Sequence, residues 1–349
     1  MKQSSQLVLY GFCHLVVDLV CVVLVLSSQR LGMIAEVQYW WLIVVYNFLA
    51  FGTQVGWGMW LDKWQKPKNA VMISFLLIIF GCFSSGLNVY AMVILLGLGN
   101  ALFHVGAGSW VLNIAEGKAS RPGLFVAPGA LGLFLGVIWS KTEINYYWIL
   151  VLLMGLCLIL VFLLVKPGNC YQKKSVKVNF GWELVVFLML LTVQLRSLIG
   201  VILVFSWKSS FVWLMISAMG IVLGKGLGGI LADRFGWRKI GLGSLVISIG
   251  LLTWGASNPI LAIVGLFLFN FTMPITLSVL ANVLPGRPGL AFGLTCLALW
   301  LGVIPSILGL DYWLKNGWVV GGLLLLSVIA LFFGLEYYYL LKNNHGKNV

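Results

Sequence analysis

The feature that most limits the fold of this chain is a series of long apolar runs separated by short polar or charged stretches. An α-helix needs about 20 apolar residues to cross the hydrocarbon core of a bilayer. Of the 349 residues, 61% are hydrophobic and only 9% are charged, whereas roughly a quarter of the residues in a soluble domain are charged. The chain is therefore predicted to be an integral membrane protein without a sizeable soluble domain.

Charged residues and clusters of Gly, Pro, Ser or Asn divide the apolar sequence into twelve segments. Backbone polar groups in lipid must be satisfied within the segment, so each segment is predicted to be a helix. The segments are expected near 6–28, 38–61, 69–86, 88–113, 123–140 and 146–165, and near 183–205, 210–231, 239–256, 258–284, 289–309 and 317–341. The predicted architecture is all-α, with six-helix bundles at 1–165 and 183–349 and a basic cytoplasmic linker at 166–182.

The basic residues predict how the chain is oriented. If twelve spans place successive connections on alternate sides, one side carries 16 Lys and Arg residues and the other carries four, while Arg196 and Lys225 lie within spans. Because Lys and Arg accumulate on the cytoplasmic side, both termini are predicted to be cytoplasmic in a cell membrane. This distribution accounts for the net charge of +13 through topology, so the charge does not indicate a nucleic-acid partner.

An internal repeat relates the two halves. Residues 120–140 align with 286–306 without a gap, and 11 of the 21 positions are identical. The shared positions include an R-P-G-L entry at Arg121 and Arg287 and an L-G-V-I exit. Spans five and eleven are therefore predicted to be equivalent helices of two parallel six-helix repeats.

A second repeated element follows spans two and eight. In each copy a Gly lies four residues before an Asp at the predicted cytoplasmic end of a helix, and cations follow. The first copy comprises Gly58, Asp62 and Lys63, and the second comprises Gly229, Asp233, Arg234, Gly236 and Arg238. A carboxylate there can meet the positive amino-terminal end of a neighbouring helix. We predict a gating latch; a purely topological role of these charges is the alternative.

These residues resemble the major facilitator superfamily. Its loop signature, G-x-x-x-D-R-x-G-R-R, is well matched from Gly229 onward and loosely matched from Gly58, where Gln65 replaces the second Gly. The resemblance covers the whole chain, with twelve spans, a central basic loop and parallel repeats. It implies a secondary transporter in which two bundles rock around a site near the membrane midplane.

Four of the ionisable residues within predicted spans are candidates for function, since such groups are costly in a membrane. His14 and Asp18, four residues apart on span one, share a helix face. His104 on span four is expected at about the depth of His14, and Arg196 on span seven at about the depth of Asp18. Spans one, four, seven and ten line the central cavity in the superfamily, so the resemblance implies that these four groups meet at one site.

The residue types suggest separate roles. Arg196 can bind a carboxylate, phosphonate or phosphate through two parallel hydrogen bonds, while Asp18 and His14 are predicted to couple protons to that binding. An Asp18–Arg196 ion pair that only joins the two halves is the alternative. Four further polar residues are predicted to contact the substrate: His104, Asn100, Asn47 and Gln194.

Three motifs narrow the resemblance. The H-x-x-x-D of His14 to Asp18, the G-x-G-x-x-x-F-H of Gly97 to His104 and the L-R-S around Arg196 resemble the fosmidomycin-resistance branch. Membership of this branch implies a drug exporter that exchanges its substrate for protons.

The sequence thus predicts a monomeric, proton-coupled exporter of a small anionic or amphiphilic compound, surrounded by lipid. Since it contains no HExxH or GxSxG motif and its cysteines lack metal-type spacing, no enzymatic activity, metal or cofactor is expected. Two alternatives stay open. One is a proton-independent importer or uniporter of an organic anion, and the other is a membrane sensor or scaffold that keeps the fold without transporting.

Overall fold

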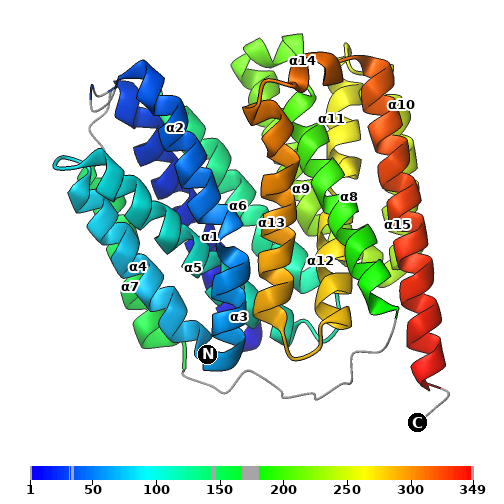
Figure 1. The fold of residues 1–349 in the computed structure, drawn as a ribbon, viewed down its shortest axis with the longest axis horizontal. Helices are drawn as coiled ribbons and strands as arrows, with labels where there is room; N and C mark the ends of the chain where they lie inside the picture. The colour runs from blue at the N-terminus through cyan, green and yellow to red at the C-terminus, as the bar shows by residue number, and fades with distance from the viewer. Residues whose placement is uncertain (1, 31, 33–34, 143–146, 167–180, 347–349) are drawn as a thin grey trace. The chain divides into compact units, whose positions relative to one another are not determined.

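A computed structural model describes residues 2–30, 32, 35–142, 147–166 and 181–346. All regular secondary structure in these residues is helical, and Figure 1 shows the helices in chain order. The predicted linker at 166–182 lies outside the described residues except at its two ends.

The chain divides into two compact units. Unit 1 comprises Met1–Ile114, Pro128–Gln172 and Arg287–Leu297, and unit 2 comprises Ala115–Ala127, Lys173–Gly286 and Ala298–Val349. Two helices, α6 (Ser120–Trp139) and α13 (Pro288–Ile307), contribute one part to each unit.

The remaining helices belong to single units. Unit 1 contains α1 (Gln3–Arg30), α2 (Glu36–Asn47), η1 (Phe48–Gly52), α3 (Gln54–Trp64), α4 (Pro67–Ser84), α5 (Val89–Ile114) and α7 (Tyr147–Leu164). Unit 2 contains α8 (Trp182–Ile202), η2 (Ser206–Ser209), α9 (Phe211–Phe235), α10 (Trp237–Thr253), α11 (Pro259–Phe269), α12 (Thr272–Val283), α14 (Asp311–Leu314) and α15 (Gly317–Gly346).

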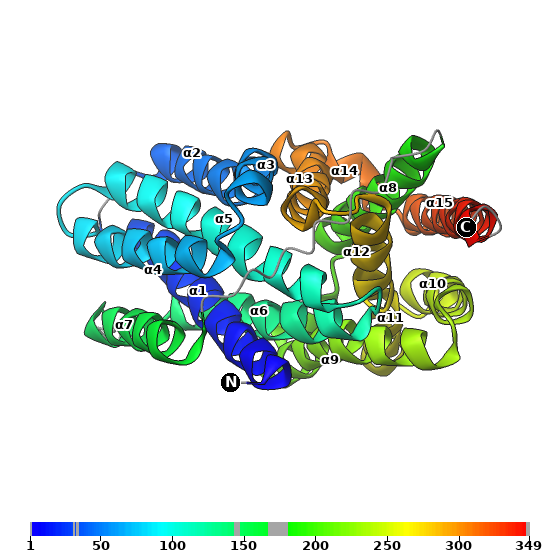
Figure 2. The same ribbon diagram turned by 90° about the horizontal axis from the view of Figure 1, so that it is seen from below.

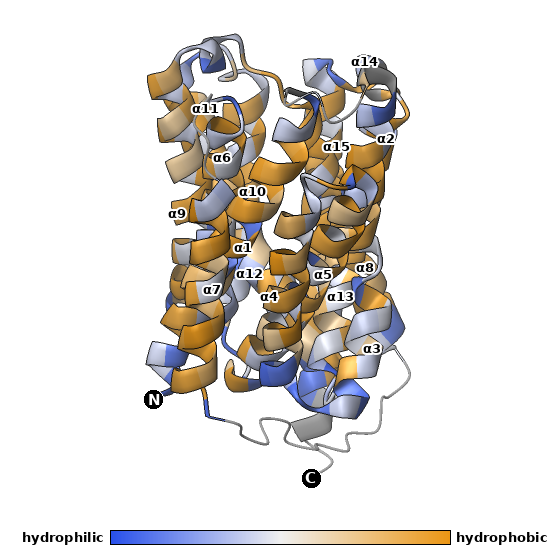
Figure 3. Cartoon of the chain, turned by 90° about the vertical axis from the view of Figure 1, so that its left-hand side faces the viewer, coloured by the Kyte–Doolittle hydropathy of each residue, from blue (hydrophilic) through white to orange (hydrophobic). Residues whose placement is uncertain are grey.

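Each of the twelve predicted segments is largely helical where the structure describes it. Among the described residues, eleven segments contain helices that are long and apolar enough to cross a membrane, and the twelfth is the 17-residue α10. Apolar residues dominate the helices in Figure 3, as the surroundings of a bilayer require.

Two of the spans are interrupted. Between α2 and α3 the chain widens into the π-turn η1, where the side chains of Thr53 and Gln54 donate hydrogen bonds to the carbonyls of Leu49 and Ala50. Side-chain donors of this kind occupy carbonyls that a widened turn releases from the regular pattern.

The second interruption separates α11 from α12 at Asn270 and Phe271. Pro274 explains it, because a proline has no N–H to donate to the carbonyl four residues earlier, here that of Asn270. The side-chain amide of Asn270 instead donates to the Leu266 carbonyl at 2.8 Å. A gap in the backbone ladder thus lies in the middle of a membrane span.

Helices α1 and α5 position the polar residues of unit 1. They pack directly on each other, and Figure 2 shows them side by side. Most of α5 is buried among its neighbours, including the whole stretch from Gly99 to Leu112. Polar side chains on this helix are therefore enclosed by protein rather than by lipid.

Candidate functional site

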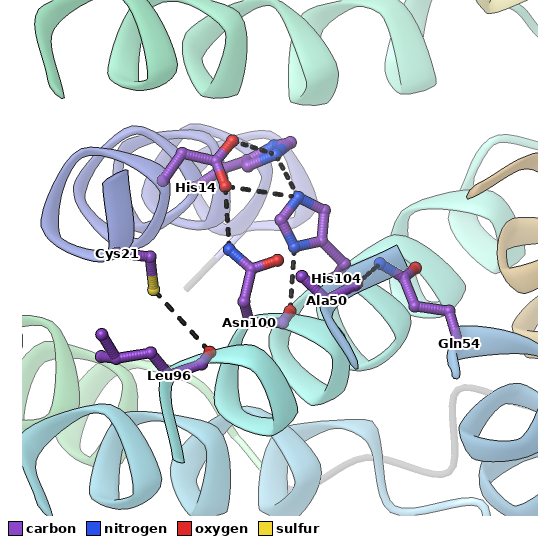
Figure 4. A network of polar contacts seen from close by, with 8 residues as sticks. His14, Cys21, Ala50, Gln54, Leu96, Asn100 and His104 are labelled. Carbon is purple, nitrogen blue, oxygen red and sulfur yellow. Dashed lines mark hydrogen bonds and ion pairs between the residues drawn. The ribbon is translucent and has the colours of Figure 1, made fainter. Parts of the chain in front are cut away.

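Four polar side chains form a buried cluster between α1 and α5. His14 and Asp18 come from α1, Asn100 and His104 come from α5, and each is at most 5% exposed. His14 Nε2 lies 3.3 Å from Asp18 Oδ2, and His104 Nε2 lies 3.6 Å from Asp18 Oδ1. Asn100 Nδ2 donates to Asp18 Oδ1 at 3.2 Å. Figure 4 shows His14 from one helix and Asn100 and His104 from the other converging on this cluster.

The hydrogen bonds determine where the ring protons lie. His104 Nδ1 is 2.9 Å from the Asn100 carbonyl, which can only accept, so Nδ1 carries a hydrogen. In the neutral ring, His104 Nε2 is then an acceptor. Because His14 Nε2 lies 2.9 Å from it, His14 Nε2 is the donor in that contact.

This arrangement can hold or release one further proton. Only one hydrogen fits between the two Nε2 atoms at 2.9 Å. A proton added to His104 Nε2 would have to point at Asp18 instead, and the His14 ring would have to turn away. Proton uptake at this cluster therefore requires its side chains to rearrange.

The walls around the two histidines are closely packed. A Cβ atom at Gly129 on α6 would lie only 2.2 Å from His14 Nε2, so this glycine makes room for the ring. The rings of Phe51 and Phe292 lie 6.4 Å from that of His104. Apolar walls of this kind exclude water and strengthen the electrostatic contacts inside.

The cluster also has the composition of a metal site, with two imidazoles and a carboxylate whose ligand atoms lie within 4.8 Å of one another. A tetrahedral Zn²⁺ with bonds near 2.0 Å needs roughly 3.3 Å between its ligand atoms, with every lone pair directed at the ion. The 2.9 Å contact of His14 with His104 is instead that of a hydrogen bond. The geometry therefore fits a proton better than a metal.

Arg196 occupies a different site, in unit 2. It is only 6% exposed, and its Nη1 and Nη2 atoms have no hydrogen-bond partner among the described residues. It lines a cavity of about 230 Å³, together with Lys208 and Lys225. Since Asp18 belongs to unit 1 and Arg196 to unit 2, both the predicted coupling between them and the alternative ion pair stay predictions.

The other predicted substrate contacts are distributed differently. Asn100 and His104 belong to the cluster around Asp18. The Asn47 amide donates to the Ile43 carbonyl of its own helix at 2.8 Å. Gln194 is partly buried on α8, one turn before Ser197, and does not line the cavity of Arg196.

Two cations of this cavity were not among the predicted site residues. Lys208 and Lys225 both line the Arg196 cavity. The aromatic neighbours Phe205 and Trp207 were a usable signal, because cations often rest on aromatic rings.

The repeated loop residues lie at helix ends. Asp62 accepts hydrogen bonds from the backbone N–H groups of Gly289 and Leu290, at the start of α13. A Cβ at Gly58 would lie 2.3 Å from the Gly289 carbonyl, so the close approach requires a glycine. Carboxylates at such positions compensate the positive end of the helix dipole.

The second copy makes related contacts. Asp233 accepts from the N–H groups of Ala119 and Ser120 at 2.8 Å, at the start of α6. Its Oδ1 also accepts from Trp237 Nε1 at 3.0 Å.

The glycines and cations of the loops vary in their contacts. A Cβ at Gly229 would lie 2.4 Å from the Ala119 carbonyl, and Gly236 adopts a φ of +100°. Arg238 pairs with Glu336 at 2.7 Å, whereas Lys63 and Arg234 are exposed. The gating role of these residues stays a prediction.

Comparisons with known proteins bear on the fold. No family model matches the sequence, and no curated protein does. A variant of the E. coli fucose:proton symporter FucP matches with a TM-score of 0.73 at 13% identity, over 95% of this chain and 98% of that one. The proton:xylose symporter XylE, a major facilitator superfamily protein, matches with a TM-score of 0.66 at 14% identity, over 97% of both chains. The human organic anion transporter TETRAN matches with a TM-score of 0.68 at 15% identity, over 95% of this chain and all of that one.

The chain has the major facilitator fold. This confirms the predicted architecture of twelve membrane helices in two six-helix repeats. At these identities the likeness establishes the fold alone, and the chemistry of the chain has to be argued from its own residues.

Proposed function

We propose that this protein is a secondary-active transporter of the cell membrane that works by alternating access and exports a small anionic or amphiphilic compound in exchange for protons. The observation that carries the proposal is the buried cluster of His14, Asp18, Asn100 and His104. Ionisable groups at this depth are costly, by about 2.5 to 3.5 kcal/mol for an Asp on insertion scales, and are found where ions or protons move.

The cluster supports proton coupling because it can exist in two arrangements. Without an extra proton, His14 donates to His104 and lies beside Asp18. When His104 Nε2 takes up an extra proton, His104 and Asp18 can form a charged pair. A transporter that must change shape when it binds or releases a proton needs such a pair of states.

Arg196 supports an anionic cargo. Its two terminal nitrogen atoms are buried and line a cavity, and a guanidinium matches the paired oxygens of a carboxylate or phosphate. The coupling step of the proposal links protonation of the Asp18 cluster to anion binding at Arg196, whose guanidinium stays charged throughout.

We infer membership of the major facilitator superfamily, and of its fosmidomycin-resistance branch, from the motifs at His14–Asp18, Gly97–His104 and Leu195–Ser197. The further proposals are a monomer with lipid as its surroundings, bundles at 1–165 and 183–349, and both termini in the cytoplasm.

A growth and flux experiment tests the function. A drug-sensitive bacterium expresses the native protein, Asp18→Asn or Glu183→Gln at equal membrane levels and is challenged with fosmidomycin. Vesicles from the same cells report proton movement when the drug is added. We expect protection and proton flux from the native protein and from Glu183→Gln, an exposed carboxylate outside both sites, and neither from Asp18→Asn.

Two results would favour the alternatives. Drug flux without proton movement in the native protein would indicate an importer or uniporter of organic anions. If Asp18→Asn and Arg196→Gln leave every phenotype of the protein intact, a sensor or scaffold that only retains the fold is the better description.

A further inference from the structure

The cavity around Arg196 concentrates positive charge. Three cationic side chains line it: Arg196 from α8, Lys208 from η2 and Lys225 from α9. None of the residues described as lining it is an Asp or Glu. The cavity lies entirely within unit 2, so its walls do not depend on unit 1.

Arg196 is the strongest sign of a ligand. A buried polar atom without a partner destabilises the folded protein, and the cost is greater when the group is charged. Two such atoms, Nη1 and Nη2, belong to Arg196, which is only 6% exposed. A bound ion is one explanation of such a group in a native protein, and the cavity beside it has room for one.

Lys208 brings a second charge to the cavity. Its ammonium rests 4.7 Å from the centre of the Phe205 ring and 5.9 Å from that of Trp207. Partial burial lowers the pKa of Lys208 below its usual range. A bound anion would reverse that effect, since an opposite charge nearby favours the charged amine.

The interrupted span contributes a third feature. Asn270 and Met273 line the cavity from the break and from the start of α12, a helix of twelve residues. The amino end of α12 carries a partial positive charge, and the carboxyl end of α11 at the same break carries a partial negative one. The positive charge of the cavity therefore comes from its side chains.

We propose that this cavity binds an anionic group with two negative charges, such as a sulfate or a phosphate, with the Arg196 guanidinium donating to two oxygens and Lys208 compensating the second charge. A monoanion would leave one of these two cations without a counter-charge in a site of low dielectric. At about 230 Å³ the cavity is smaller than the roughly 300–1,000 Å³ of sites for drug-sized ligands. It therefore fits an anionic head group rather than a whole large molecule.

This inference rests on the proposed function and names the charge class of the cargo. Its test is direct binding, separate from transport. The purified full-length protein in lipid nanodiscs is titrated with sodium sulfate and with sodium acetate at constant ionic strength, and binding is followed by calorimetry. We expect saturable sulfate binding at least about tenfold tighter than acetate binding, the equivalent of 1.4 kcal/mol.

Three variants locate the site. Arg196→Gln should weaken sulfate binding by about tenfold or more, because two charge-assisted hydrogen bonds are lost. Arg196→Lys keeps the positive charge but loses the paired N–H donors of the guanidinium. Its affinity for sulfate should lie between those of the native protein and Arg196→Gln. Lys208→Gln should weaken binding severalfold, whereas Lys315→Gln, an exposed cation of the same unit outside the cavity, should leave it unchanged.

The outcomes separate the two proposals. Acetate binding as tight as sulfate binding, or unchanged binding in both Arg196→Lys and Lys208→Gln, overturns the dianion site even if proton-coupled transport is intact. We expect Asp18→Asn to bind sulfate normally. If the protein binds sulfate but its transport does not depend on a proton gradient, the proposed proton coupling is overturned and the dianion site in the cavity stands.

Discussion

At the scale of single residues, the hydrogen bond between two histidines defines what the cluster can do. His14→Gln keeps a side-chain N–H for His104 and Asp18 but removes the imidazole ring. We expect this variant to fold with a free energy of unfolding within about 1 kcal/mol of the native value and to lose proton-dependent flux. Thermal unfolding in detergent and vesicle flux measure the two effects.

His14→Phe is the matched comparison for that prediction. It keeps a ring but leaves the acceptors on His104 and Asp18 without their donor, so stability should fall by about 1–3 kcal/mol. Normal proton dependence in His14→Gln would show that this histidine is structural.

At the scale of helices, small residues decide how closely the elements approach. Gly129→Ala would place a methyl group 2.2 Å from His14 Nε2, so the ring has to move. We expect a loss of about 1–3 kcal/mol of stability from overpacking, together with weaker proton coupling. Gly155→Ala on α7 is the control, since nothing lies within 4 Å of its added Cβ. Equal behaviour of the two variants would contradict the packing described for α6 and α1.

The carboxylates at the helix ends lead to a second prediction at this scale. Asp62 and Asp233 each accept two backbone N–H groups. Asp62→Asn and Asp233→Asn should each lower stability by about 1 kcal/mol, because a charge is removed from the positive end of a helix. Unfolding curves measure the change, and the exposed Glu116→Gln serves as the control. If all three variants unfold at the same temperature, the contacts of Asp62 and Asp233 do not stabilise the fold, and the alternative of a purely topological role is favoured.

At the scale of the whole molecule, the distribution of cations predicts orientation. A membrane-impermeant maleimide should label Ser209→Cys in intact cells, and it should label Glu116→Cys only after the membrane is opened. The five cysteines described as free are buried. Cys170 lies outside the described residues, in the predicted cytoplasmic linker, so the unmodified protein measures the background after the membrane is opened. Labelling of the unmodified protein from outside would reverse the proposed topology.

The sequence predicted the architecture because hydropathy and charge act over whole segments. All twelve segments were identified, and the four-residue spacing placed His14 and Asp18 on one face of α1. That His104 meets these two residues was implied only by the family resemblance, because one sequence does not determine how each helix is rotated about its axis.

Local interruptions were harder to predict. The π-turn at Phe48–Gly52 has no proline, and its Thr53 and Gln54 side chains look like any others in a polar stretch of helix. Pro274 did signal the break between α11 and α12, although proline is tolerated within membrane helices. Lys208 and Lys225 could not be placed together without the turn of η2 and the rotation of α9.

The single hydrogen held between His14 and His104 has a consequence for energetics. If a carrier takes up one proton for each dianion it exports, three elementary charges move across the membrane in every cycle. Each charge is worth about 2.3 kcal/mol per 100 mV, so an inside-negative voltage drives this exchange more strongly than a one-unit pH gradient does. The rate of such an exporter would follow the membrane potential, and collapsing the voltage with valinomycin and potassium would slow it even at constant pH.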